Sequence, residues 1–154
     1  ALISLGKTGT KLSSFNEITG FLSSSETRQL ISALWSFGKI ASRSKQKPLG
    51  IKDIEPYIPQ LVRIAKTHNH ACVLHNCIYA LVESCDSRYN GEKVSPATKN
   101  SVANLFEYVQ KKYSYDLSFM RLVDIAKKAL KGESLNSSEE KVLLDIRNNV
   151  SIND

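Results

Sequence analysis

Apolar residues recur along this chain at the spacing of amphipathic helices. Between Asn69 and Cys85 the apolar set lies at i, i+3, i+4 and i+7, namely Leu74, Cys77, Ile78 and Leu81. This spacing puts the four side chains on one face of a helix, which needs partners to cover it. We therefore predict a helix here, with Cys77 and Leu81 at the centre of the core.

The same pattern occurs 44 residues earlier and again 45 residues later, with Trp35 in the earlier copy where the middle copy has Tyr79. The two further copies are Leu30, Ala33, Leu34 and Phe37, and Phe119, Leu122, Val123 and Ala126. A second set also repeats at 44 residues: Ile58, Leu61, Val62 and Ala65, then Val102, Leu105, Phe106 and Val109. The chain is thus predicted to repeat a unit of two helices.

Capping residues and breakers set the expected boundaries. Ser14 with Glu17 and Ser137 with Glu140 match the capping box. Further N-caps are expected at Asp53, Asn69, Ser95 and Asp116, and Gly132 is expected to end a helix. We predict an extended arm over residues 1–13 and a helical-repeat domain over 14–150. Its hairpins should span about 14–43, 54–85 and 96–131, its polar loops 44–52 and 86–95, and its closing helix about 138–149.

A two-helix unit of roughly 40 to 47 residues is the period of HEAT and armadillo arrays. The segment over 58–85, IPQLVRIAKTHNHACVLHNCIYALVESC, resembles one such unit. The fold class we predict is all-α, an α-solenoid of about three antiparallel hairpins plus a closing helix, with six to seven helices. Such arrays bury their apolar stripes by stacking, and they present extended surfaces to partners.

A second segment has another resemblance. The run over 30–40, LISALWSFGKI, is similar to the helices with an ALW motif in the repeats of organellar RNA-binding proteins of the FAST-kinase-like and octotricopeptide type. Tyr79 replaces the tryptophan in the next unit. This resemblance implies RNA binding by a helical-repeat protein.

The formal net charge of +6 is placed unevenly. Residues 1–77 hold ten Lys and Arg against four acids, whereas residues 78–154 hold eleven of each. Five bases without an acid between them form the candidate site for an anion or nucleic acid: Lys39, Arg43, Lys45, Lys47 and Lys52. Their potentials add, so an anionic partner should contact this segment. The alternative is an ordinary solvated loop.

Other chemistry in the sequence is sparse. All histidines and cysteines lie between His68 and Cys85, but on a helix only Cys72 and His75 share a face, so these two are the candidate metal ligands and we expect no metal site. Gly6, Lys7 and Thr8 match a phosphate loop without its strand and helix. We find no acid–base set, so we expect a protein that is not an enzyme and has no cofactor.

These patterns favour a non-enzymatic scaffold that binds a protein partner, as a subunit or fragment of a larger assembly. The alternative is a protein that binds RNA or another nucleic acid through its basic N-terminal half. No apolar run reaches 18 residues, so we expect no membrane insertion, and we expect no small-molecule partner. Three cysteines of unsuitable spacing favour a reducing, intracellular location in the cytoplasm, or in an organelle if a targeting peptide has been removed.

Overall fold

The computed structural model describes residues 12–42, 49–89 and 91–150. The helices are α2 (Leu12–Gly20), α3 (Thr27–Ala41), α4 (Ile51–Ile54), α5 (Ile58–Thr67), α6 (Ala71–Cys85), α7 (Pro96–Lys112), α8 (Leu117–Lys131) and α9 (Ser137–Asn148). Short 3-10 turns follow α2 at Phe21–Ser23 and α4 at Glu55–Tyr57. The described residues contain no strand, so the predicted all-α class is confirmed.

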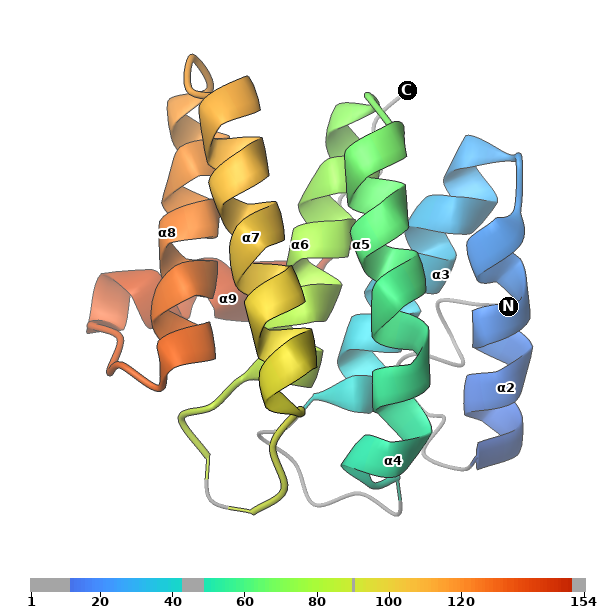
Figure 1. Cartoon of the computed structure of the whole chain (residues 1–154). Coiled ribbons are helices and arrows are strands. Elements are labelled where there is room, and N and C mark those ends of the chain that lie inside the picture. The colour runs from blue at the N-terminus through green and yellow to red at the C-terminus, as the bar shows by residue number, and fades with distance from the viewer. Residues whose placement is uncertain (1–11, 43–48, 90, 151–154) are drawn as a thin grey trace.

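The long helices lie in two rows (Figure 1). Helix α6 packs between α3 and α8, while α5 and α7 pack beside each other in front of them. Consecutive helices form pairs, because α2 packs on α3, α5 on α6 and α7 on α8. The finer prediction, that these pairs form a solenoid of HEAT or armadillo type, stays a prediction.

The repeated apolar positions all lie in the core. Every member of the three sets on α3, α6 and α8, and of the two sets on α5 and α7, is buried. Cys77 and Leu81 are both fully buried, as predicted. The residues spaced 44 to 45 apart are therefore core residues on each of these helices.

Helix α6 is the centre of the core. All of its residues except Ala71 and His75 are buried. Its closest neighbour, α3, approaches at Gly38, where an added Cβ would lie 2.6 Å from the Tyr79 ring and 3.2 Å from the Cα of Ala80. A glycine inside a helix weakens it by roughly 0.5–1 kcal/mol relative to alanine, so its presence here fits a need for close helix packing.

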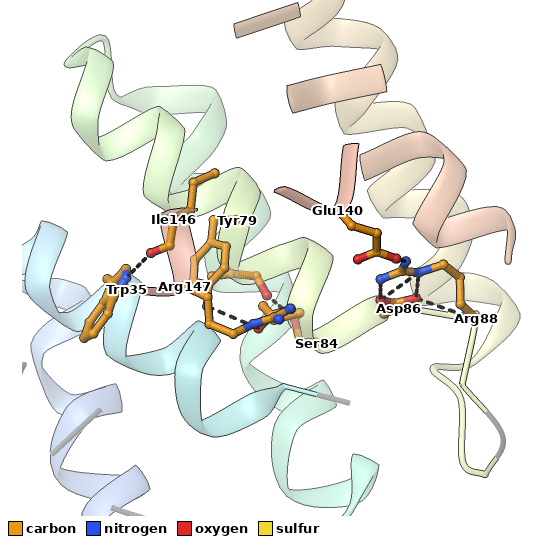
Figure 2. Close-up of polar contacts among 10 residues, drawn as sticks. Trp35, Tyr79, Ser84, Asp86, Arg88, Glu140, Ile146 and Arg147 are labelled. Atoms are coloured by element: carbon orange, nitrogen blue, oxygen red, sulfur yellow. Dashed lines mark hydrogen bonds and ion pairs between the residues drawn. The ribbon is translucent and has the colours of Figure 1, made fainter. Parts of the chain in front are cut away.

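Helix α9 crosses the row and is fixed to it by buried polar contacts (Figure 2). The Arg147 guanidinium donates two hydrogen bonds to the Glu83 carboxylate of α6, at 2.9 and 2.7 Å. The Tyr79 hydroxyl donates to the same carboxylate at 3.1 Å. Burial raises the pKa of Tyr79, and the nearby Glu83 charge raises it further. The Tyr79 hydroxyl therefore keeps its proton. The Glu83 side chain is only 1% exposed, which makes these donors essential to it.

Further contacts hold the two ends of α9. The Trp35 indole of α3 donates to the Ile146 carbonyl at 2.8 Å, and the Lys128 ammonium of α8 bonds to Glu139 at 2.8 Å. Just after α6, the Arg88 guanidinium forms a bidentate ion pair with the buried Asp86 carboxylate. It also forms an ion pair with Glu140 of α9 at 2.5 Å. Helix α9 is therefore tied to all three helices of the inner row.

Several predicted boundaries were wrong by a few residues. Helix α2 begins at Leu12, so the arm predicted over 1–13 cannot include residues 12 and 13, and Ser14 is inside the helix rather than its cap. The predicted loop over 44–52 ends earlier, because α4 begins at Ile51. The closing helix spans Ser137–Asn148, close to the predicted 138–149. Helix ends shift easily because their last turns gain few hydrogen bonds.

Some predicted caps were also wrong. Helix α6 is capped by His70 and not by Asn69, because Nδ1 of His70 accepts from Cys72 N at 3.2 Å. The last capping box is formed by Asn136 with Glu139, one residue before the predicted pair. Asp53 lies within α4, where its carboxylate accepts from Gly50 N. The expected caps Ser95 and Asp116 and the C-terminal Gly132, with φ of 81°, are confirmed.

No helix within the described residues has the length and apolar character needed to cross a bilayer.

Replacing Arg147 by methionine should destabilise the fold, because it leaves the buried Glu83 carboxylate without its cation. The expected cost is about 3–5 kcal/mol in the free energy of unfolding, measured by urea denaturation. Lys141→Met is the matched control, since the Lys141–Asp145 pair on the same helix is exposed. That variant should change stability by no more than about 0.5 kcal/mol. Equal effects of the two substitutions would contradict the assigned role of the Glu83 pair.

Candidate functional site

A cavity is lined by residues from the turn joining α5 to α6 and from the turn joining α7 to α8. Both turns lie at the upper edge of Figure 1. The volume of the cavity is about 270 Å³. The lining comes from the first turn and a half of α6 and from the turn and first residues of α8: Asn69, Ala71, Cys72, Leu74, His75, Tyr113, Tyr115, Asp116, Ser118 and Phe119. Two segments far apart in the sequence thus form one site.

Aromatic rings make much of the wall on the α8 side. The Tyr113 ring meets Phe119 edge to face, with centroids 5.6 Å apart and an interplanar angle of 88°. Tyr115 lies next to Tyr113, with centroids 6.4 Å apart. Edge-to-face packing fixes the Tyr113 and Phe119 rings relative to each other. The wall on the α8 side is therefore a preformed surface for an apolar or aromatic group.

Two polar atoms in this wall are buried without a hydrogen-bond partner among the described residues. They are Nδ1 of His75 and the hydroxyl oxygen of Tyr113. Leaving such a group unsatisfied costs about 1–3 kcal/mol, so most buried polar atoms in proteins are paired.

Burial lowers the pKa of His75, and the Asp116 carboxylate opposes this shift. The imidazole is therefore neutral near pH 7. A neutral imidazole has one nitrogen that donates and one that accepts, and the bonds it makes select the tautomer. Nδ1 of His75 can thus serve as a donor or as an acceptor toward a ligand.

Charged groups of both signs lie near the cavity. Asp116 caps α8, because its Oδ1 accepts from Phe119 N at 3.0 Å. The Lys112 ammonium lies outside the lining, 5.4 Å from the Tyr113 ring centroid and 3.5 Å from Oδ1 of Asn69. The N-termini of α6 and α8 add partial positive charge at the same end. The cavity therefore has no strong preference for a charged ligand of either sign.

Two large apolar side chains at the start of α8 are exposed, and one of them lines the cavity. Tyr115 is 79% exposed and Leu117 is 80% exposed, the highest values for large apolar residues in the described part of the chain. They flank Asp116 in the sequence, and Tyr115 itself lines the cavity. Exposed apolar residues grouped beside a cavity are typical of binding surfaces.

The candidate metal ligands Cys72 and His75 both line this cavity. The predicted sharing of one helix face is therefore observed. Within the described residues, however, no three potential ligands come together to hold a metal ion. No disulfide joins the described cysteines, and burial raises the pKa of Cys77 and of Cys85 to about 12, which keeps both thiols protonated.

The structure describes only two of the five basic candidates. Lys39 is half-buried on α3, with its ammonium 5.5 Å from the Trp35 ring centroid, and Lys52 is exposed on α4. Arg43, Lys45 and Lys47 lie outside the described residues. The prediction of an anion-binding segment therefore stays a prediction.

No family model, curated protein or solved structure matches this chain. The candidate site is therefore assigned from its own geometry.

Sequence reasoning singled out only part of this site. It selected Cys72 and His75, as candidate metal ligands, and Asp116, as a helix cap, but not Tyr113, Tyr115 or Leu117. One signal was present: Leu117 directly follows the cap and lies off the apolar stripe that begins at Phe119. An apolar residue off the stripe faces away from the core, so its position indicated an exposed surface.

Replacing Asp116 by asparagine should lower the pKa of His75 further. The carboxylate is the one nearby charge that raises this pKa, and asparagine can still cap α8. NMR titration of the imidazole resonances would measure the pKa of His75 in both proteins. In the unmodified protein this pKa should already lie below the ordinary value for histidine. Asp124→Asn on the exposed face of α8 is the control and should leave it unchanged. A rise in the pKa would contradict the described placement of the two side chains.

Proposed function

We propose that this chain is a non-enzymatic helical-repeat scaffold that binds another protein. The contact surface consists of the cavity and its edge residues Tyr115 and Leu117. The same surface serves whether the chain acts alone or as part of a larger assembly. A HEAT-like or armadillo-like solenoid is the proposed form of the repeat.

Two features support the repeat. Corresponding positions 44 to 45 residues apart are buried on α3, α6 and α8, and these helices pack in chain order. Residues 44 apart on α5 and α7 are buried as well, and these two helices also pack together. In repeat arrays each unit contacts its neighbours in this way.

The exposed pair beside the cavity is the observation on which the binding proposal rests. Tyr115 and Leu117 stand 79% and 80% exposed next to a cavity with two unpartnered polar atoms. Binding energy at protein interfaces is concentrated in a few aromatic or apolar residues and the pockets that they fill. Covering this surface would bury the two exposed apolar side chains.

A peptide library displayed on phage tests the surface with no partner chosen in advance. We expect selection on the full chain to enrich peptides that bind it. Replacing both Tyr115 and Leu117 by serine should weaken the selected peptides at least tenfold, since hot-spot side chains contribute about 2 kcal/mol or more. Affinities would be measured by fluorescence anisotropy.

Leu144→Ser is the matched control, because Leu144 is an exposed leucine on α9. It should leave peptide affinity unchanged. All three substitutions are at exposed positions, so circular dichroism should show unchanged helicity. Enriched peptides that bind the double variant as well as the original protein would contradict the proposed surface, as would a selection that enriches none.

Nucleic-acid binding is the second proposal, supported by the acid-free set of bases and by the charge excess of residues 1–77. It would use Lys39, Arg43, Lys45, Lys47 and Lys52 rather than the cavity. Phosphate contacts of this kind depend strongly on salt, whereas apolar protein contacts do not.

Titration of labelled single-stranded RNA at two salt concentrations distinguishes the proposals. If RNA is the partner, affinity should fall steeply with salt and should weaken when Lys45 and Lys47 are both changed to glutamate. The Tyr115 and Leu117 double variant should then bind RNA normally. Absence of RNA binding at low salt would exclude this second proposal.

A further inference from the structure

A second cavity is lined only by residues of α7 and α8, which pack side by side at one edge of the molecule (Figure 1). We propose that this cavity binds a small organic anion with an apolar body, such as an aryl-substituted carboxylate. The site is separate from the surface of the proposed function, because the two cavities share no lining residue. The inference differs from the expectation, drawn from the sequence alone, that no small molecule binds.

Part of the lining is apolar. The core residues Phe106 and Leu130 contribute to it together with the half-buried Ala103. The lining lysines add methylene groups, because a lysine stem can lie along apolar surface while its ammonium stays in water. The volume is about 260 Å³, slightly below the roughly 300–1,000 Å³ of pockets for drug-sized ligands. The cavity therefore suits a ligand the size of one ring with a short chain.

The charged part of the lining is mainly positive. Lys99 of α7 and Lys127 and Lys131 of α8 line the cavity with one acid, Glu107, so three lysines against one glutamate give a net charge of +2. The Lys127 ammonium is 2.6 Å from the Glu107 carboxylate and donates to Gln110 at 2.8 Å. Within the described residues, no carboxylate forms an ion pair with Lys99 or Lys131. The excess charge is thus left for a ligand.

This positive charge acts on the one carboxylate that is already present. The hydrogen bond and charge of Lys127 lower the pKa of Glu107, and the charges of Lys111 and Lys131 lower it further. A second anion placed in the cavity would be attracted by the same ammonium groups, whereas a cation would be repelled by them. The electrostatics of the cavity therefore favour an anion.

The unpaired lysines lie toward one end of the hairpin that α7 and α8 form. Lys99 is in the first turn of α7 and Lys131 is the last residue of α8, so both are separated along the helices from Glu107. The Asn100 amide lines the cavity next to Lys99 and can donate N–H groups to an anion. We expect the anionic group of the ligand at this end and its apolar body beside Ala103.

Three probes of similar shape test the charge selectivity on the full chain. Phenylacetate is the anion, phenylacetamide is the neutral probe and phenethylammonium is the cation. Binding would be followed by NMR through the side-chain amides of Asn100 and Asn104 and the methyl group of Ala103, which all line the cavity. Phenylacetate should bind most tightly, and its affinity should fall with added salt. Acetate, which lacks the apolar body, should bind more weakly than phenylacetate.

Replacing either unpaired lysine tests the anionic end of the site. Lys99→Met and Lys131→Met should each weaken phenylacetate binding roughly 2–5-fold, as expected for one exposed ion pair, and leave phenylacetamide binding unchanged. Lys66→Met is the matched control, because Lys66 is an exposed lysine of α5 outside the lining. It should change neither affinity.

Glu107→Gln should act in the opposite direction. It removes the carboxylate that competes for Lys127 and keeps the shape of the side chain, so phenylacetate should bind roughly 2–5-fold more tightly. Glu17→Gln on α2 is the control, since Glu17 is exposed and lies outside the lining. It should leave the affinity unchanged.

The inference is overturned if any of the other three probes binds as tightly as phenylacetate. It is also overturned if Lys99→Met, Lys131→Met and Glu107→Gln all leave the phenylacetate affinity unchanged. The double variant of Tyr115 and Leu117 separates this result from the proposed function, because it should lose the selected peptides and still bind phenylacetate. Failure of the peptide selection would therefore leave the anion site intact, and failure of phenylacetate binding would leave the peptide surface intact.

Discussion

Burial of α6 on nearly every side constrains the rest of this structure. A helix in that position needs neighbours on all faces, and α3, α5 and α8 supply them. The sequence of α6 suits this buried position, because apolar or small residues occupy most of its positions. On the neighbouring helix, Gly38 of α3 allows a close approach to α6. Both α3 and α8 have a buried apolar face, and both pack against α6. The order of the inner row follows from that shared pattern.

The same burial explains why α9 is held so firmly. Glu83 lies on the central helix, where an unpaired carboxylate would be strongly destabilising. Arg147 and Tyr79 supply its hydrogen bonds, while Trp35 bonds to the backbone of the adjacent Ile146. Trp35 and Tyr79 occupy the same position in successive copies of the repeat. Trp35 and Tyr79 therefore provide polar contacts around α9 as well as core packing.

Much of the fold could be predicted from the sequence because it depends on local periodicity. Helix faces, the core role of Cys77 and Leu81, and the caps Ser95 and Asp116 all follow from spacing within a few residues. Contacts between distant segments could not be predicted in this way. The pairing of Glu83 with Arg147, 64 residues apart, depends on the angle at which α9 crosses the row. The cavity likewise depends on how two turns meet in space, so its two halves have no joint signal in the sequence.

The two ends of α6 differ in a way that locates the candidate site. Near its C-terminus, the buried carboxylates of Glu83 and Asp86 are matched by Arg147 and Arg88. Near its N-terminus, Nδ1 of His75 is buried with no hydrogen-bond partner among the described residues. Ala71 and His75, the two residues of α6 that are not buried, also lie at this end and line the cavity. Within the described structure, the core is thus satisfied at one end of its central helix and incomplete at the other. The exposed Tyr115 and Leu117 lie at this same end, at the start of α8, which is why the proposed contact surface is placed there.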